Sequence, residues 1–207
     1  MSQIDDLQEL LRRLPGIGPR QARRFVYFLL NADQHFIQAL THQIQNLRSQ
    51  KHACTFCRRL YFSESFDNDL CPTCSDVSRD LSKVMIIEKN SDFENINASG
   101  VWNGRYFLIY KNLGILQEDA AEVLRLNTLR SQIEDGAIKE IVIALSVNPE
   151  GEFTSQVITK ELLEYKESHG LVLSQLARGL STGSEIEYAD AETLRLALKN
   201  RETKKDV

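Results

Sequence analysis

Residues 14–19 read LPGIGP and interrupt the run LQELLRRLPGIGPRQARRFVYFLL at 7–30, where apolar residues otherwise recur at helical spacing. Pro15 ends the first helical pattern, because proline lacks an N–H donor and disfavours helical geometry at the residue before it. Pro19 suits the first position of a second helix. The stretch therefore predicts two helices joined by a tight turn, and similar periodicity predicts a third helix near 35–48.

The residues of this turn and of the helix after it suit an anion. Gly16 and Gly18 permit backbone angles closed to other residues and place no side chain in the way, so the N–H groups of the second helix are open to a ligand. Arg20, Arg23 and Arg24 follow, on the helix face that we expect to lie opposite the apolar residues. Amides and guanidinium groups bind the DNA backbone without reading a base. We predict DNA binding by these five residues; the alternative is a packed helical hairpin whose arginines serve solubility.

The composition is that of a globular protein, with 207 residues, 42% of them hydrophobic and 26% charged. No apolar run approaches the roughly 20 residues of a membrane span, and the N-terminal MSQIDDLQEL lacks the pattern of a secretory signal. We therefore expect a cytoplasmic protein with no membrane partner. The net charge is −4, but residues 1–60 carry nine Lys or Arg and four Asp or Glu, which gives +5 there and −9 elsewhere. Because the local field governs binding, the basic end can still hold phosphates.

All four cysteines lie in CTFCRRLYFSESFDNDLCPTC at residues 54–74. Cys54 and Cys57 form one C-x2-C pair, and Cys71 and Cys74 form a second pair after thirteen residues. Four thiolates in this pattern surround a tetrahedral Zn²⁺ and leave no open position for catalysis, so we predict a structural zinc finger whose metal supplies folding free energy. Disulfides are the weaker interpretation in a reducing cytoplasm. Four buried metal-free cysteines fit poorly with the polar linker SESFDND.

From residue 81 onward, short β-rich runs alternate with helical patterns. The runs are VMIIE at 84–88, RYFLIY at 105–110, EIVIAL at 140–145 and LVLSQLA at 171–177. Buried apolar strands separated by helices predict a parallel α/β sheet. The last stretch, DAETLRLALKN at 190–200, predicts a closing helix.

Three glutamates follow strands of this predicted sheet. Glu88 ends VMIIE, while Glu150 and Glu152 lie in SVNPEGE after EIVIAL. Functional groups in open parallel sheets gather at the carboxyl ends of strands, so these carboxylates would converge and could hold Mg²⁺ if the two strands are neighbours. The alternative is that each glutamate caps the helix that follows its strand.

The order of these modules resembles the RecR family of bacterial recombination mediators. The resemblance is carried by LPGIGPRQARR, by CTFCRRLYF and LCPTC, and by the terminal LARGLSTGSEIEYADAETLRLAL at 176–198, which is the most family-specific part. It implies a helix-hairpin-helix DNA-binding region at 1–52, a four-cysteine zinc finger at 53–76, a Toprim-type α/β domain at 80–175 and a family-specific segment with a helix at 176–207.

The resemblance also implies a function. Members of the family are non-enzymatic, bind single-stranded, double-stranded or gapped DNA, act with RecO and RecF to load RecA during repair of DNA damage, and assemble as dimers or ring-like tetramers. The terminal segment is implied to help close the sheet and the subunit contacts. It supplies Arg178, Gly179, Gly183, Glu187, Tyr188 and Asp190.

The acidic residues at 88, 150 and 152 match the family, but three neighbouring features differ. The family's usual glutamate pair is Glu88 followed by Lys89, and its usual Gly-Gly near the end of the second strand is replaced in FLIYKNLG at 107–114. The family's Asn-Pro stands a few residues before the Glu-Gly-Glu, whereas Asn148 and Pro149 directly precede it here.

The alternative function is a Mg²⁺-dependent Toprim-type nuclease or phosphoryl-transfer enzyme. Such enzymes typically need an Asp-x-Asp after a later strand and a general acid or nucleophile elsewhere. The chain has Glu-Gly-Glu instead, its cysteines are all assigned to zinc, and its four histidines have no nucleophile partner in the sequence pattern. The sequence therefore favours a DNA-binding protein without catalysis.

Overall fold

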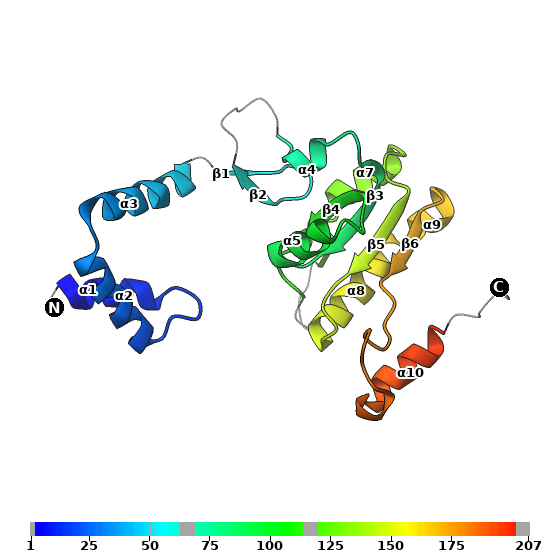
Figure 1. The fold of residues 1–207 in the computed structure, drawn as a ribbon. Coiled ribbons are helices and arrows are strands. Elements are labelled where there is room, and N and C mark those ends of the chain that lie inside the picture. The colour runs from blue at the N-terminus through cyan, green and yellow to red at the C-terminus, as the bar shows by residue number, and fades with distance from the viewer. Residues whose placement is uncertain (1–2, 50, 63–68, 114–119, 202–207) are drawn as a thin grey trace. The chain divides into compact units, whose positions relative to one another are not determined.

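The computed structural model describes residues 3–49, 51–62, 69–113 and 120–201, and the chain divides into two compact units (Figure 1). The first unit comprises residues 1–52 with 62–65, and the second comprises 53–61 with 66–207. Among the described helices, none has both the length and the apolar character that crossing a membrane requires.

The first unit consists of three helices. They are α1 (Gln3–Arg12), α2 (Pro19–Asn31) and α3 (Gln34–Ser49). The two helices on either side of LPGIGP pack against each other, and Pro19 is the first residue of α2. The predicted hairpin and third helix are therefore confirmed. Among the described residues of this unit, only Ala22 and Val26 are buried.

The cysteine segment forms short strands and a short helix, and it packs against the core of the second unit. Its elements are β1 (Lys51–Ala53), paired with β2 (Leu60–Phe62), and the short helix α4 (Pro72–Ser75). The Cys57 carbonyl accepts a hydrogen bond of 3.2 Å from the Leu108 amide of the main sheet. The Phe56 ring packs edge-on against Phe107 of the same strand, with centroids 6.1 Å apart. The cysteines thus belong to the same apolar cluster as the sheet.

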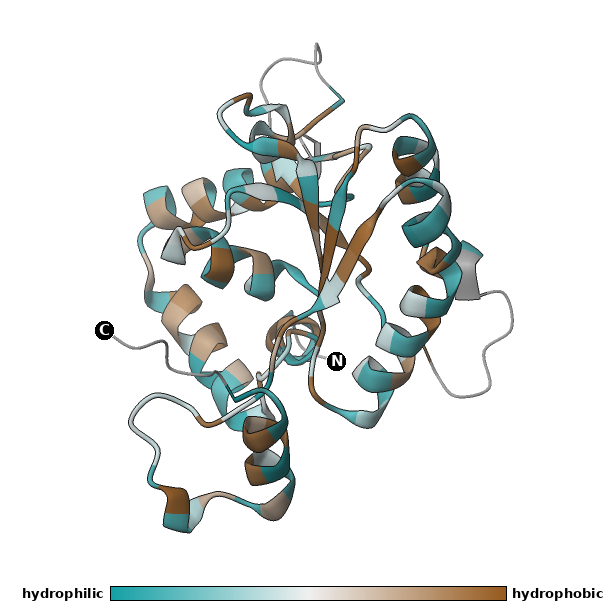
Figure 2. Cartoon of the chain, turned by 90° about the vertical axis from the view of Figure 1, so that its right-hand side faces the viewer, coloured by the Kyte–Doolittle hydropathy of each residue, from teal (hydrophilic) through white to brown (hydrophobic). Residues whose placement is uncertain are grey.

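The main sheet of the second unit is parallel throughout, as predicted. Its order is β4-β3-β5-β6, formed by β3 (Asp80–Ile87), β4 (Gly104–Leu108), β5 (Glu140–Ala144) and β6 (Val172–Gln175). Ile86 in β3 pairs with Phe107 on one side and with Ile143 on the other. Every residue of β4 is buried, and Figure 2 shows the hydrophobic residues concentrated on these central strands.

Helices connect the strands. They are α5 (Asn90–Ser99), α6 (Ala120–Val123), α7 (Asn127–Glu134), α8 (Pro149–Leu162) and α9 (Glu164–Ser168). Right-handed crossovers with this strand order place α5 on one face and α7 with α8 on the other. The Arg130–Glu161 ion pair joins α7 to α8, in agreement with that placement. The chain continues through a 3₁₀ turn, η1 (Ile186–Tyr188), to the predicted closing helix α10 (Ala191–Lys199).

Candidate metal centre and nucleic-acid interface

Two backbone turns hold the four cysteines together. Cys54 and Cys57 lie in the turn between β1 and β2, where the Cys54 amide donates to the Arg59 carbonyl at 2.9 Å and the Arg58 amide donates to the Cys54 carbonyl at 2.9 Å. Cys71 precedes α4, and the Cys74 amide donates to the Cys71 carbonyl at 2.9 Å. The C-x2-C spacing thus closes two tight turns whose side chains face one another.

The geometry of the four thiols fits a metal. All four side chains are buried free thiols, and their Sγ atoms lie within 4.8 Å of one another. The Cys57 and Cys71 Sγ atoms are 3.6 Å apart, close to the ~3.8 Å edge of a tetrahedron with ~2.3 Å metal–sulfur bonds and far beyond the ~2.05 Å of a disulfide bond. Within the described ranges this is the only group of three or more Cys, His, Asp or Glu residues able to bind a metal ion.

Proton sharing among the thiols indicates why a cation is needed. The Cys57 thiol donates a hydrogen bond to Cys54, which lowers the pKa of Cys54 to about 6. The same hydrogen bond raises the pKa of Cys57 above its ordinary value. In the same way, hydrogen bonding with Cys54 lowers the pKa of Cys71 and raises that of Cys74. Four adjacent thiolates become compatible with one another only when a cation offsets their repulsion.

Two arginines supply positive charge around this centre. Arg105 on β4 is buried, lies with Cζ 3.9 Å from the Phe56 ring centroid and donates from Nη2 to Gln132 Oε1 at 2.9 Å. Arg59 lies 3.9 Å from the Phe93 ring centroid and donates to Thr73 Oγ1 at 3.2 Å. A divalent ion with four thiolates has a net charge of −2, which two guanidinium groups balance. The sequence did not predict a role for Arg105 at this centre, because the residue lies inside an apolar strand, far along the chain from the cysteines.

In the hairpin turn, the two glycines have different roles. Gly16 has φ 78°, in the left-handed region, so this position requires glycine as predicted. Gly18 has φ −83° and ψ 172°, an extended conformation open to any residue, so the expectation of a special backbone angle is wrong there. A Cβ at either position would meet no atom within 4 Å. Gly18 also caps α2 without a side-chain hydrogen bond, so the first amides of this helix lack a side-chain acceptor from the cap residue.

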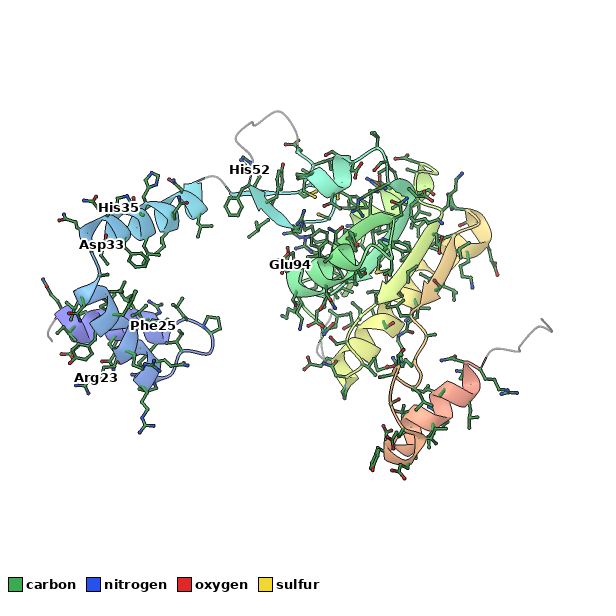
Figure 3. All side chains as sticks on the ribbon, viewed as in Figure 1. Arg23, Phe25, Asp33, His35, His52 and Glu94 are labelled. Atoms are coloured by element: carbon green, nitrogen blue, oxygen red, sulfur yellow. The ribbon has the colours of Figure 1, made fainter. Side chains whose placement is uncertain are left out.

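The three arginines of α2 are all exposed. None of them forms an ion pair with any residue in the described part of the chain. Arg23 and Phe25 project from α2 in different directions (Figure 3), and Arg23 Cζ is 5.8 Å from the Tyr27 ring centroid. Arg24 differs from the expectation, because it lines an apolar groove together with Phe25. It sits beside the apolar residues rather than opposite them, since one position along a helix turns the side chain by only about 100°.

Two of the three glutamates have separate partners in the structure. Strands β3 and β5 are neighbours, as convergence of the carboxylates requires. Glu88 accepts a hydrogen bond of 2.6 Å from Ser146 Oγ, Glu152 forms an ion pair with Arg178, and Glu150 lies exposed in the first turn of α8. Among the described residues, these three carboxylates do not come close enough together to bind one metal ion. The glutamates are not helix caps either, because Lys89 caps α5 and Asn148 caps α8, with Glu150 and Glu152 in the first turn of α8.

Asn148 and Pro149, directly before Glu150, form the start of α8. Asn148 caps α8, accepting a hydrogen bond of 2.7 Å from the Gly151 amide through Oδ1, and Pro149 begins the helix. A Cβ on Gly151 would collide with the Ser146 carbonyl oxygen. The glycine between the two glutamates is therefore required by packing.

FLIYKNLG, which stands where the family usually has Gly-Gly, contains a strained residue. Tyr110 has φ 57°, in the left-handed region that favours glycine. Its amide donates to the Glu88 carbonyl at 2.8 Å, and its hydroxyl donates to Asn90 Oδ1 at 3.1 Å. These hydrogen bonds offset the strain of a non-glycine residue there.

The residues singled out in the terminal segment shape its turns. Gly183 has φ 82°, and Asp190 caps α10 by accepting from the Thr193 amide at 2.9 Å. Gly179 lies against Ala197, since an added Cβ there would be 3.8 Å from the Ala197 Cα. Glu187 and Tyr188 are exposed. The segment thus presents an ordered surface without a core of its own.

Comparison with known proteins gives consistent matches. A family model described as RecR, helix-hairpin-helix, matches residues 4–48, and one described as RecR, C-terminal, matches residues 179–202. The chain is 32% identical to the "Recombination protein RecR" of Bdellovibrio bacteriovorus, over 97% of each chain. It is 35% identical to the protein of the same name from Syntrophomonas wolfei, over 96% of this chain and 95% of the relative. The protein of that name from Chloroflexus aggregans is 33% identical, over 94% and 91% respectively.

The metal centre leads to the first prediction. Cys57→Ser is expected to abolish stoichiometric binding of a divalent metal and to lower the melting temperature, because a hydroxyl is a poor substitute for a thiolate ligand and the remaining buried thiols lose their common cation. Ser75→Ala is the matched control, since Ser75 Oγ donates only to main-chain carbonyls beside the centre. Metal analysis of the purified proteins and thermal denaturation measure both effects. Full metal content and an unaltered melting temperature in Cys57→Ser would contradict the metal centre.

Proposed function

The chain belongs to the RecR family of recombination proteins, and from this premise we propose that it is a non-enzymatic, DNA-binding mediator of recombinational repair. In this proposal it acts with RecO and RecF to load RecA at gapped DNA. The observation that supports DNA binding best is the open N-terminus of α2 next to three exposed arginines without ion-pair partners among the described residues.

The hairpin has the chemistry of a phosphate contact. Gly18 leaves the end of α2 free of any side chain, so a phosphate oxygen can approach the amides directly. Arg20 and Arg24 then add charge within the first two turns of the helix. Such contacts are independent of base sequence and release counterions from the DNA, so binding falls steeply with salt. A mediator that acts wherever a gap occurs needs this kind of binding.

The proposed metal is Zn²⁺. Four thiolates are soft ligands that favour zinc over Mg²⁺, and a closed four-ligand site leaves no position for a substrate. When bound, zinc would supply structural cross-linking of the two cysteine turns. Arg59 and Arg105 would balance the charge of the centre.

The surroundings of the glutamates support a protein without catalysis. Glu88 and Glu152 are engaged by Ser146 and Arg178, so their oxygens are not directed at one common ion. Metal-dependent phosphoryl transfer needs carboxylates that hold the ion in a fixed position.

We further propose that copies of the chain assemble through the first unit. An apolar groove of about 660 Å³ runs across its helices, lined by Leu11, Leu14, Ile17, Gln21, Arg24, Phe25, Phe28, Leu29, Phe36, Leu40 and Ile44. Phe28 and Ile44 are each more than half exposed. Exposed apolar surfaces of this kind mark interaction sites. A second copy would cover the groove and present several hairpins to one DNA molecule, which raises affinity through effective concentration.

DNA binding by the hairpin is tested by removing two charges. Arg20→Ala combined with Arg24→Ala is expected to weaken binding to duplexes of any sequence and to reduce the slope of log K against log salt by about 1.8, since each lost phosphate contact removes about 0.9. Fluorescence anisotropy across a salt series measures both quantities. Arg195→Ala is the control, because that exposed arginine is paired with Glu192. An unchanged slope in the double variant would reject these arginines as backbone contacts.

Assembly is tested by introducing charge into the groove. Light scattering of the wild-type chain at micromolar concentration is expected to give a mass above that of a monomer, and Phe28→Glu with Ile44→Glu is expected to lower it, because a carboxylate in an apolar interface loses its hydration. Val77→Glu serves as the control, since Val77 is exposed in the second unit. A clean wild-type monomer would refute assembly through this surface.

Absence of catalysis is tested with gapped plasmid and Mg²⁺. The purified protein is expected to leave the DNA intact, because Glu88 and Glu152 are engaged by other side chains. A column carrying the same gapped DNA is expected to retain the protein. Agarose electrophoresis detects nicking. Metal-dependent nicking that disappears in Glu88→Gln would establish the enzyme instead.

A further inference from the structure

A second basic site lies in the other unit, in a pocket beside the first cysteine pair. This open pocket has a volume of about 610 Å³ and lies wholly in the second unit. It is lined by Arg58, Glu122, Val123, Arg125, Asn127 and Thr128. None of these residues is a metal ligand, and none has a part in the hairpin contact.

The two arginines of the pocket lack anionic partners. Arg58 Nη1 is a buried atom without a hydrogen-bond partner, and neither Arg58 nor Arg125 forms an ion pair with a described residue. Both guanidinium groups line the same pocket, so their positive charges repel each other. Two guanidinium groups that repel each other in a pocket are stabilised when an anion lies between them.

The backbone is strained where these arginines meet. Arg58 has φ 67° and Arg125 has φ 52°, and Tyr110 of the same unit has φ 57°. They are the non-glycine residues with positive φ in the described part of the chain. A left-handed conformation is unfavourable for a residue that has a Cβ, and strain of this kind clusters at binding sites. The left-handed conformation of Arg58 also helps to form the turn that holds Cys54 and Cys57. Arg125 lies in a turn that contains no cysteine, so a metal centre does not account for its strained backbone.

Further hydrogen-bond donors border the pocket. Helix α7 begins there with Asn127 and Thr128, and its cap residue Leu126 gives no side-chain hydrogen bond to the first amides. The amides and the two side chains therefore add donors to those of the arginines. The acidic residue of the lining is Glu122, so Arg58, Arg125 and Glu122 together have a charge of +1.

We propose that this pocket binds a phosphodiester of DNA, as a second backbone contact separate from the hairpin. The inference rests on the proposed DNA-binding function and adds a site to it. The charge of +1 matches a phosphodiester, which has one negative charge, rather than a phosphate monoester with nearly two. The guanidinium forks suit the paired oxygens of a phosphate. The openness of the pocket suits a chain that passes through rather than a small molecule that is enclosed.

Two substitutions with opposite expected effects on DNA affinity test the site. Arg125→Gly removes one charge and relieves the left-handed strain, so its melting temperature should equal or exceed that of the wild type while DNA affinity falls about five- to tenfold near 0.1 M salt and the duplex salt slope decreases by about 0.9. Glu122→Gln removes the competing carboxylate and should raise affinity. Arg195→Ala is the control and should bind as the wild type does. Anisotropy with labelled duplex and single-stranded oligonucleotides provides the readout.

Three results would overturn the inference. First, Arg125→Gly could bind DNA with wild-type affinity and salt slope while the variant lacking Arg20 and Arg24 remains impaired. That result would reject this pocket and keep DNA binding by the hairpin. Binding of inorganic phosphate that depends on Arg125, without any effect of Arg125→Gly on DNA, would assign the pocket to a free anion. A wild-type chain that fails to bind DNA at low salt would remove the hairpin function and this inference together.

Discussion

The repulsion among four buried thiolates is the constraint on which the second unit depends. Their Sγ atoms lie within 4.8 Å of one another, a spacing that a divalent cation stabilises and that thiolates alone do not. The cysteine turns are joined directly to the sheet, because the Leu108 amide donates to the Cys57 carbonyl and Phe56 packs on Phe107. Loss of the cation would therefore disturb the end of β4 as well as the turns. The same turn places Arg58 at its pocket.

Much of the fold could be predicted from the sequence, because local rules determine it. Alternation of short apolar runs with helical patterns located the four strands of the parallel sheet, and cysteine spacing located the metal centre. Proline chemistry located the start of α2 at Pro19. These features depend on neighbours a few residues apart, so they do not require knowledge of the tertiary structure.

Side-chain partners could not be predicted in the same way. Glu88 meets Ser146, fifty-eight positions away, and Arg105 meets Gln132 across twenty-seven, so their roles follow only from the folded chain. The expectation for Gly18 was wrong because glycine has two uses, a left-handed angle or an open surface, and sequence alone does not separate them. Arg24 was placed opposite the apolar residues although it lies beside them, since a broad apolar stripe on a short helix leaves little room for a purely polar face.

The distribution of arginine partners relates the acidic composition to nucleic-acid binding. Arg12, Arg130, Arg178 and Arg195 are paired with carboxylates. The arginines of α2 and of the Arg58 pocket have no such partner among the described residues. The first unit also buries only Ala22 and Val26 among its described residues, too small a core for some fifty residues to stand alone. In the proposed assembly, another copy covers the exposed apolar groove of this unit, which completes its core and multiplies the unpaired arginines available to one DNA. Stability and affinity in this chain would thus depend on the same surface.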